Sequence, residues 1–246
     1  MQIAYFSAAM SRARAGHHLP KFWPEDIPYL TNPAYSKAVG PDVLRTTNPK
    51  FDLNSDVKTV SHTNGPSSLV KIIEIKDPAH PASGQHGLFA AQRLCPDTFI
   101  LFYLGNVHGS SDADPNSDYD LSLDRELGIA VDASKMGNEA RFINDFRGVA
   151  VSPNAEFRDI WVGIGKGLFE KRMAVYVLPA GKSGKRAKGI AKGEEILVSY
   201  GKGFWIERER EKHGDTGPPG DLTEHDTSSA SGFARAIKVI GTPTAA

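Results

Sequence analysis

Short apolar runs separated by turn-rich segments constrain the fold of this chain more than any other feature. Residues 69–75 (LVKIIEI) alternate apolar and polar side chains, and residues 98–105 (TFILFYLG) form a continuous apolar run that ends at a glycine. Alternation is typical of a half-buried strand, and a short continuous run is typical of a buried one. Further runs of strand length lie at 128–133, 173–178 and 195–200. Helical periods are few, so the sequence predicts a β-rich fold with short helices.

The composition along the sequence divides it into three parts. Residues 1–68 are rich in Pro, Asn, Ser and Thr with interspersed aromatic residues, which indicates an ordered but irregular N-terminal arm. Residues 69–206 contain the strand-like runs and form the expected domain. Residues 207–246 begin with a short charged helix and continue with Gly, Pro, Ser, Thr and Asp, which predicts a mostly disordered tail. An apolar island at 232–241 interrupts this tail.

Charge and cysteine content exclude several classes of protein. The 29 basic residues balance 29 acidic residues, so the whole molecule has no general attraction for nucleic acid or anionic membranes. No apolar run is long enough to span a bilayer. The single cysteine, Cys95, cannot build a disulfide framework or a cysteine-rich zinc cluster within the chain. We therefore expect an intracellular protein, nuclear or cytoplasmic, without a bound metal.

Two glycine-rich motifs do not meet the requirements of nucleotide-binding loops. The motif AGKSGK would need a glycine five residues before Gly181, where Tyr176 stands. The motif GIGKGL at 163–168 lacks the flanking strand and helix of a dinucleotide site, and a flexible hairpin is expected instead. The loop 182–192 is strongly basic. It is either a docking surface for an acidic substrate or nucleic acid, or a solvated hairpin tip.

Three segments that are far apart in the sequence share a chemistry suited to one site. The first is SGQHGLFAA (83–91), in which a glycine would let the backbone approach a ligand closely. The second is GNEARFIND (137–145), where an amide and a carboxylate follow apolar residues. The third is KGEEILVSYGKGFW (192–205), a strand-like run that ends in Tyr200 and Gly201 before an aromatic pair.

Together these segments resemble the SET-domain protein-lysine methyltransferases over residues 69–206. The motifs HGLFAA, FYLG, VDASKMGNEARFIND, PNAEF and KGEEILVSYGKGFW occur in the order and spacing of that family. The resemblance implies small curved sheets closed by a knot-like crossing, S-adenosyl-L-methionine as cofactor, and a protein or peptide substrate that presents a lysine. The charge balance and the short apolar runs predict no membrane partner, and nucleic acid only through the basic loop 182–192. A catalytically weak SET module that binds cofactor or a protein partner is the alternative.

The resemblance also implies roles for individual residues. Tyr200 matches the catalytic tyrosine that orients the methyl group and the amine, and Tyr103 matches the tyrosine that lines the lysine channel. Phe142 and Ile143 would fill the core of the crossing, and Arg141 would be structural. The residues implied in cofactor binding are His86, Gly87, Leu88, Asn144, Asp145 and Trp205.

Two positions depart from the family pattern. Gln85 stands where the family usually has the first glycine of a glycine-x-glycine pair, and Asp145 stands where it usually has histidine. Asp145 either contacts the cofactor, through its backbone or its carboxylate, or caps a turn before Gly148. Trp205 either stacks on adenine or packs in the core. Val198 leaves room at a position where the family often has an aromatic side chain.

Overall fold

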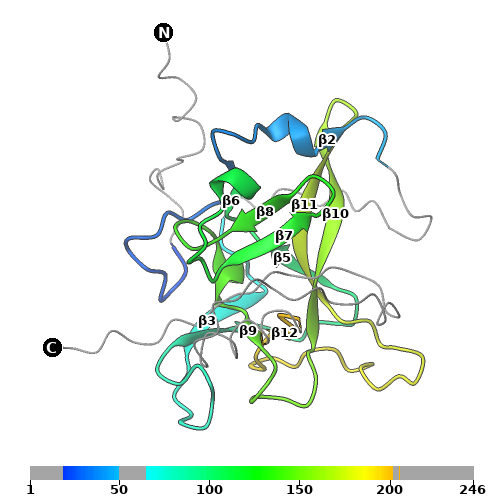
Figure 1. The fold of residues 1–246 in the computed structure, drawn as a ribbon. Coiled ribbons are helices and arrows are strands. Elements are labelled where there is room, and N and C mark those ends of the chain that lie inside the picture. The colour runs from blue at the N-terminus through cyan, green and yellow to red at the C-terminus, as the bar shows by residue number, and fades with distance from the viewer. Residues whose placement is uncertain (1–18, 50–64, 202–204, 206–246) are drawn as a thin grey trace, which may run out of the picture.

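The computed structural model describes residues 19–49, 65–201 and 205. This part of the chain is β-rich, which confirms the predicted fold class. Figure 1 shows several small sheets arranged beside one long hairpin. The helical segments among the described residues are short 3-10 turns, and none of them has the length and apolar character needed to cross a membrane. They are η1 (Pro41–Leu44), η2 (Ser110–Asp112) and η3 (Glu139–Phe142).

The long hairpin consists of the antiparallel strands β10 (Ala155–Gly165) and β11 (Leu168–Val177). The GIGKGL motif forms the tip of this hairpin, where Gly165, Lys166 and Gly167 all have positive φ angles. Strand β11 also pairs with β5 (Phe99–Phe102) and with β2 (Arg45–Thr46). The hairpin therefore connects the N-terminal arm to the centre of the molecule.

A second sheet has the strand order β1-β6-β8-β7. Strand β1 runs parallel to β6, and the other neighbours are antiparallel. Because β1 and β2 both precede residue 50, the described part of the arm adds a strand to each of the two larger sheets. The bounds of this sheet are β1 (Ala34–Tyr35), β6 (Asn106–Gly109), β7 (Asp120–Asp124) and β8 (Ile129–Asp132).

Two small strand pairs bring the segments 83–91, 137–145 and 192–205 together. Strand β3 (Val70–Glu74) is antiparallel to β4 (His86–Ala90), and β9 (Asn144–Asp145) is parallel to β12 (Leu197–Val198). The segment before β12 also pairs with β4, since the Ile196 amide donates to the Leu88 carbonyl at 2.8 Å. The glycine turn, the asparagine run and the tyrosine run thus meet at one place, near the bottom of Figure 1.

Aliphatic side chains from all of these elements form the core around that meeting point. Leu88, Ile100, Ile143, Ile196 and Val198 belong to one cluster and are almost completely buried. Burying an aliphatic side chain of this size stabilises the fold by roughly 1.5–3 kcal/mol relative to leaving it exposed. The packing holds the backbone of β4, β9 and β12 in a fixed relationship.

The run from Arg141 to Asn144 is not a continuous strand. Residues Glu139–Phe142 form the 3-10 turn η3, and only Asn144–Asp145 are in strand β9. Asn138 anchors this turn, because its amide donates to the Phe102 carbonyl at 2.9 Å and accepts from the Leu104 amide at 3.2 Å. As a result Ile143 lies in the core, whereas Phe142 packs at its edge.

The remaining expectations about the chain ends concern segments outside the described residues. These are the short charged helix after Trp205 and the apolar island 232–241. Arg141 has the structural role expected of it, since its guanidinium donates to the Ala133 carbonyl at 3.1 Å and to the Ser134 carbonyl at 3.4 Å.

Candidate active site

Tyr200 lies directly after β12 with its side chain inside the protein. The residue is 2% exposed, and its hydroxyl donates a hydrogen bond of 2.6 Å to the carbonyl of Ile143. Burial raises the pKa of this hydroxyl well above its usual value, and the nearby charge of Asp145 raises it further. Tyr200 therefore keeps its proton at neutral pH and directs it to Ile143.

Asp145 forms a turn and also holds the backbone of Tyr200. Its Oδ1 accepts from the Arg147 amide at 2.8 Å, and its Oδ2 accepts from the Tyr200 amide at 2.7 Å. The Arg147 guanidinium lies 2.9 Å from Oδ2 and completes an ion pair. Asp145 thus caps a turn that continues into Gly148 with φ of 79°, and its contact with the cofactor stays a prediction.

Trp205 lies near this turn. The Arg147 guanidinium carbon is 5.6 Å from the centre of the Trp205 ring and 4.8 Å from that of Phe146, which places the cation between two aromatic faces. Trp205 is half-buried and packs against the main core cluster. The Asp145 carboxylate thus connects Tyr200, through Arg147, to Trp205.

Tyr103 follows β5 and is buried beside Phe157, whose ring meets it edge-on at 5.5 Å. Its hydroxyl donates to the carbonyl of Tyr119 at 2.8 Å. Burial raises the pKa of Tyr103 well above its usual value, with a further contribution from the charge of Asp132. Tyr119 is not a plain surface residue: it is half-buried, and the Arg141 guanidinium lies 4.6 Å from its ring centre.

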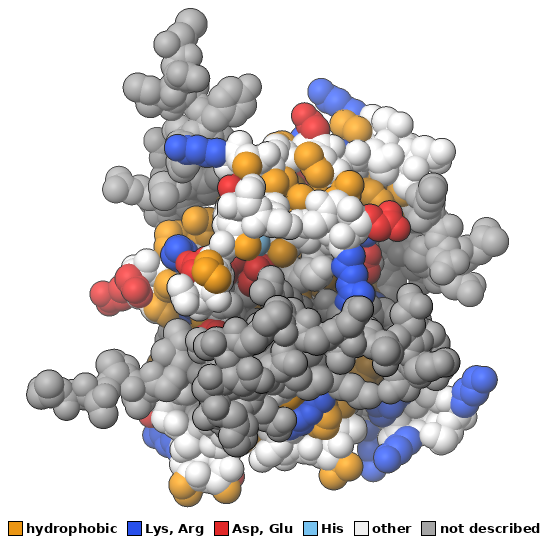
Figure 2. Space-filling view, in the orientation of Figure 1, with side chains coloured by type: hydrophobic (Ala, Val, Ile, Leu, Met, Phe, Trp, Pro, Cys, Tyr) orange, Lys and Arg blue, Asp and Glu red, His pale blue; other side chains and the backbone are white. Residues whose placement is uncertain are grey.

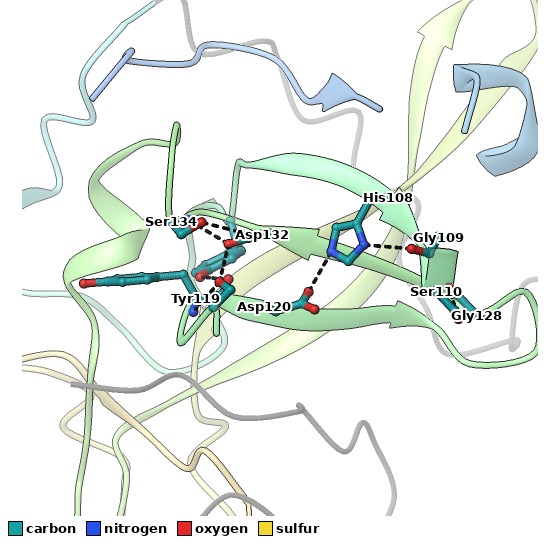
Figure 3. Close-up of polar contacts among 10 residues, drawn as sticks. His108, Gly109, Ser110, Tyr119, Asp120, Gly128, Asp132 and Ser134 are labelled. Carbon is teal, nitrogen blue, oxygen red and sulfur yellow. Dashed lines mark hydrogen bonds and ion pairs between the residues drawn. The ribbon is translucent and has the colours of Figure 1, made fainter. Parts of the chain in front are cut away.

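Asp132 fixes the turn that carries Tyr119, as Figure 3 shows. Its Oδ1 accepts from the Ser117 hydroxyl at 2.7 Å, and Ser117 in turn accepts from the Tyr119 amide at 3.2 Å. The hydroxyl of Ser134 donates to Oδ2 at 2.9 Å. The Tyr119 carbonyl, which accepts the hydrogen bond from Tyr103, is therefore held in place by the contacts of Asp132 and Ser117.

The same sheet carries an ion pair between His108 on β6 and Asp120 on β7. The His108 Nε2 and Asp120 Oδ1 atoms are 3.0 Å apart, and Nδ1 lies 3.0 Å from the Gly109 carbonyl (Figure 3). The hydrogen bond to Asp120 raises the pKa of His108 to about 9, against the opposing effect of burial. The imidazole is therefore charged at neutral pH.

Gly87 on β4 lies against the side chains of Asn144 and Glu195. A Cβ atom added at Gly87 would lie 2.5 Å from Glu195 Oε1 and 3.1 Å from Asn144 Nδ2, so glycine is required there by protein atoms. The Asn144 amide nitrogen donates to Glu195 Oε1 at 2.8 Å. Asn144 is 9% exposed, and no described residue donates to its Oδ1.

The two neighbours of Gly87 differ in their surroundings. The His86 ring packs against Phe22 at 5.1 Å and Phe142 at 6.2 Å, in an aromatic group at the surface. Leu88 is fully buried in the core, and its carbonyl is used in pairing with Ile196. His86 is therefore partly exposed within this aromatic group, whereas Leu88 lies in the core.

Sequence reasoning missed Arg147, Glu195 and His80 as parts of this site. The signal for Glu195 was a carboxylate placed directly before the apolar run ILV, where a surface residue is not expected. His80 lies in the loop between β3 and β4, and its Nε2 is 3.1 Å from Glu195 Oε2. Nothing in the local sequence around His80 indicates that contact.

A cavity of about 380 Å³ is lined by Leu197, by the segment before β10 and by the loop after β11. Its described lining includes Glu194 and Glu195 but neither of the candidate catalytic tyrosines. Figure 2 shows Lys and Arg side chains at the lower right, where this loop projects. The basic side chains that line the cavity are Lys185, Arg186 and Lys188.

The basic loop 182–192 is exposed over most of its length. Arg186 is anchored by a hydrogen bond of 2.9 Å to the Pro179 carbonyl. Within the described part of the chain, none of the cations in this loop forms an ion pair. In the same part of the chain, no three His, Cys, Asp or Glu side chains are grouped to hold a metal ion, and the metal-free state stays a prediction.

Three comparisons place this geometry among known proteins. The SET domain family model matches residues 85–201, and no curated protein matches the chain. A humanised mutant of the Chaetomium thermophilum Polycomb Repressive Complex 2 bound to an inhibitor is 24% identical with a TM-score of 0.41, and the match covers 54% of this chain and 15% of that one. Apo ctPRC2 in an autoinhibited state is 25% identical with a TM-score of 0.41, over 57% and 17%.

KRYPTONITE in complex with mCHH DNA, an H3(1–15) peptide and SAH is 17% identical with a TM-score of 0.38, over 54% of this chain and 23% of that one. This chain thus spans less than a quarter of the length of these solved chains. Their TM-scores are low, so the assignment rests on the family model and on the ordered motifs. The model's range includes Gly87, Tyr103, Asn144 and Tyr200. The resemblance seen in the sequence is confirmed, and this chain contains a SET domain at residues 85–201.

Proposed function

We propose that this protein is an S-adenosylmethionine-dependent protein-lysine N-methyltransferase. The observation that carries the proposal is the contact of the Tyr200 hydroxyl with the Ile143 carbonyl, one residue before Asn144. It joins the candidate catalytic tyrosine to the candidate cofactor-binding asparagine within the matched SET domain. The roles below are proposals supported by this geometry.

The residues around Asn144 fit the amino acid end of the cofactor. S-adenosylmethionine, when bound, supplies a methyl group on a cationic sulfonium and carries an ammonium group on its amino acid end. No described residue donates to Asn144 Oδ1, and Oε1 of Glu195 lies 2.8 Å from Nδ2 of the same amide. A neighbouring carboxylate and a carbonyl oxygen both favour a cationic ligand. The chemistry of these donors and acceptors therefore suits the group.

The other cofactor-binding assignments are proposed with more specific roles. His86 covers the ligand through its aromatic group, Gly87 allows the close approach of Asn144 and Glu195, and Leu88 supports β4 from the core. Asp145 acts by holding the backbone of Tyr200. Trp205, beside Arg147, offers an aromatic face for adenine.

Tyr200 is proposed to orient the reacting groups. Methyl transfer to an amine is an in-line displacement, which needs a neutral amine held collinear with the methyl group and the leaving sulfur. The Tyr200 hydroxyl donates its proton to the Ile143 carbonyl, and its oxygen is proposed to accept weak C–H···O contacts from the polarised methyl group. The raised pKa of Tyr200 argues against its use as a general base.

Tyr103 is proposed to line the channel for the substrate lysine. Its ring lies with Phe157 in an apolar environment, and a lysine that loses water there has a lowered pKa. A lowered pKa favours the neutral amine that the reaction requires. The substrate is a protein or peptide, and the basic loop 182–192 is proposed to dock an acidic stretch of it. We propose an intracellular location for the protein.

The second candidate function is a SET module that binds cofactor or a partner protein but transfers methyl groups poorly. The specific observation in its favour is that the Asp145 carboxylate is fully engaged with Arg147 and Tyr200. This carboxylate has replaced the family histidine and has no acceptor capacity left for a ligand. Binding without methyl transfer would distinguish this function from the first.

Calorimetry with S-adenosylhomocysteine tests the proposal. We expect one binding site per chain and weaker binding for Asn144→Ala, because the amide contact is lost. Asn116→Ala is the matched control, since Asn116 lies in an exposed turn between η2 and β7. Absence of binding to the unmodified protein at millimolar ligand would contradict the proposed function.

A further inference from the structure

A directional set of hydrogen bonds leads from the β3–β4 loop to Asn144. The Ala82 amide donates to His80 Nδ1 at 2.9 Å. His80 Nε2 lies 3.1 Å from Glu195 Oε2, and Asn144 Nδ2 lies 2.8 Å from Glu195 Oε1. We call these three side chains the His80–Glu195–Asn144 triad.

The backbone sets the direction of every bond in the triad. A backbone N–H can only donate, so His80 Nδ1 must accept and the ring proton must lie on Nε2. His80 therefore donates to Glu195. A carboxylate accepts from both sides, so the NH2 group of Asn144 must face Glu195. The carbonyl oxygen of Asn144 consequently points away from the triad.

The triad has little freedom to rearrange. The side chains of His80 and Glu195 are 8% and 9% exposed, and a buried carboxylate that loses a donor is strongly destabilising. Asn154 also fixes the backbone of Glu195, because its amide donates to the Glu195 carbonyl at 2.8 Å while its Oδ1 accepts from the Leu197 amide at 2.8 Å. Gly87 also packs against the Glu195 carboxylate, since a Cβ atom added there would lie 2.5 Å from Oε1.

We propose that Glu195 and His80 are positioning residues that make Asn144 an acceptor toward the ligand. This inference rests on the proposed function and deepens it. An unconstrained amide could turn either its carbonyl or its NH2 group to a ligand. The triad leaves only the carbonyl, so Asn144 selects ligands whose amino acid end presents an ammonium group. The triad contributes nothing to ligands that lack this end.

Two ligands separate this inference from general damage to the site. S-adenosylhomocysteine has the amino acid end, and 5′-methylthioadenosine lacks it. In Glu195→Gln one of the two acceptor oxygens becomes an NH2 group, so Asn144 can turn its carbonyl inward. We expect the affinity for S-adenosylhomocysteine to fall by about tenfold or more. The affinity for 5′-methylthioadenosine should stay within about twofold.

The neighbouring carboxylate provides a matched control. Glu194 is exposed and accepts from the Ala191 amide at 2.8 Å, without contact to the Asn144 amide. Glu194→Gln should leave both affinities unchanged. His80→Ala should weaken S-adenosylhomocysteine binding in the same direction, and its effect should not add to that of Glu195→Gln. If Glu195→Gln does not fold, His80→Ala serves for the same ligand comparison.

The outcomes separate the two proposals. Unchanged S-adenosylhomocysteine affinity in Glu195→Gln, or equal loss for both ligands, overturns the triad but leaves the proposed function standing. Failure of the unmodified protein to bind either ligand overturns the proposed function. In that case nitrogen NMR of His80 in the ligand-free protein tests the triad, and we expect the ring proton on Nε2. A proton on Nδ1 would overturn the inference.

Discussion

The hydroxyl of Tyr200 donates a 2.6 Å hydrogen bond to the backbone carbonyl of Ile143, across the parallel pair of β9 and β12. The contact joins two segments that lie far apart in the sequence, and it occurs where both are buried. It fixes the direction of the Tyr200 hydroxyl proton. The predictions that follow depend on this arrangement or on the networks that support it.

Tyr200→Phe should lower kcat with little change in cofactor affinity, because the ring is kept while the oxygen is lost. A loss of about ten- to a thousandfold corresponds to roughly 1.4–4 kcal/mol of transition-state stabilisation. Single-turnover methyl transfer measures it, and calorimetry measures the affinity. Tyr35→Phe is the control, since Tyr35 lies on β1, outside the parallel pair of β9 and β12. A wild-type single-turnover rate in Tyr200→Phe would show that the catalytic residue is misassigned.

Tyr103→Phe should change the number of methyl groups added as well as the rate. The variant frees space in the proposed channel and leaves the Tyr119 carbonyl without its 2.8 Å donor. With Val198 already small, we expect a shift toward higher methylation states. Mass spectrometry of the product reads the states directly. A product distribution identical to that of the unmodified protein would place Tyr103 outside the channel.

Asp145→Ala should destabilise the fold, because it removes the acceptor for the Arg147 and Tyr200 amides together with an ion pair. We expect a loss of about 2–3 kcal/mol in the free energy of unfolding, measured by urea denaturation. Asp42→Ala is the control. Asp42 forms an ion pair with Arg45, but its side chain is 93% exposed, so a loss below about 1 kcal/mol is expected. Equal losses in the two variants would contradict the buried role of Asp145.

The ion pair of His108 and Asp120 should make stability depend on pH. The hydrogen bond to Asp120 raises the pKa of His108 to about 9 in the folded protein, from an ordinary value of 6.5. A group whose pKa is raised on folding stabilises the folded protein fully at pH values below its unfolded pKa. This stabilisation is lost as the pH rises through the folded pKa. The melting temperature should therefore fall between pH 6.5 and 9 by more in the unmodified protein than in His108→Gln. Melting temperatures that fall equally with pH in the two proteins would contradict this prediction.

Neutralising the basic loop should weaken the docking of an acidic substrate. In the triple variant Lys182→Gln, Lys185→Gln and Lys188→Gln we expect a higher KM, a nearly unchanged kcat and a weaker dependence of KM on salt. Lys71→Gln combined with Lys166→Gln is the control, because both lysines are exposed outside this loop. An unchanged KM would support a solvated hairpin tip and leave the loop without a role in docking.

The strands that the sequence predicted are those with a clear apolar pattern. The runs at 69–75, 98–105 and 128–133 correspond to β3, β5 and β8, because their alternation or continuity reflects burial on a sheet. Strand β10 was missed, since charged side chains and glycine obscure its pattern in AEFRDIWVGIG. Its pairing with β11 is set by the tight turn at Lys166, a contact between neighbours that periodicity does not report.

The candidate site contains contacts that the sequence did not predict. The positions of Tyr103, Asn144 and Tyr200 followed from resemblance, but the partners of their polar atoms did not. Two of those partners, the carbonyls of Tyr119 and Ile143, are backbone atoms with no side-chain signature. The contact of His80 with Glu195 joins residues that are 115 positions apart, so only the fold brings them together.

The most direct test of the proposed function is mass spectrometry of a lysine-containing peptide array incubated with the protein and S-adenosylmethionine. The account predicts that at least one lysine gains one or more methyl groups, and that Tyr200→Phe under the same conditions gives much less product. The same array reports the target and the methylation state together. No methylated lysine anywhere on the array, from a protein that binds S-adenosylhomocysteine by calorimetry, would contradict the enzyme and favour the binding module.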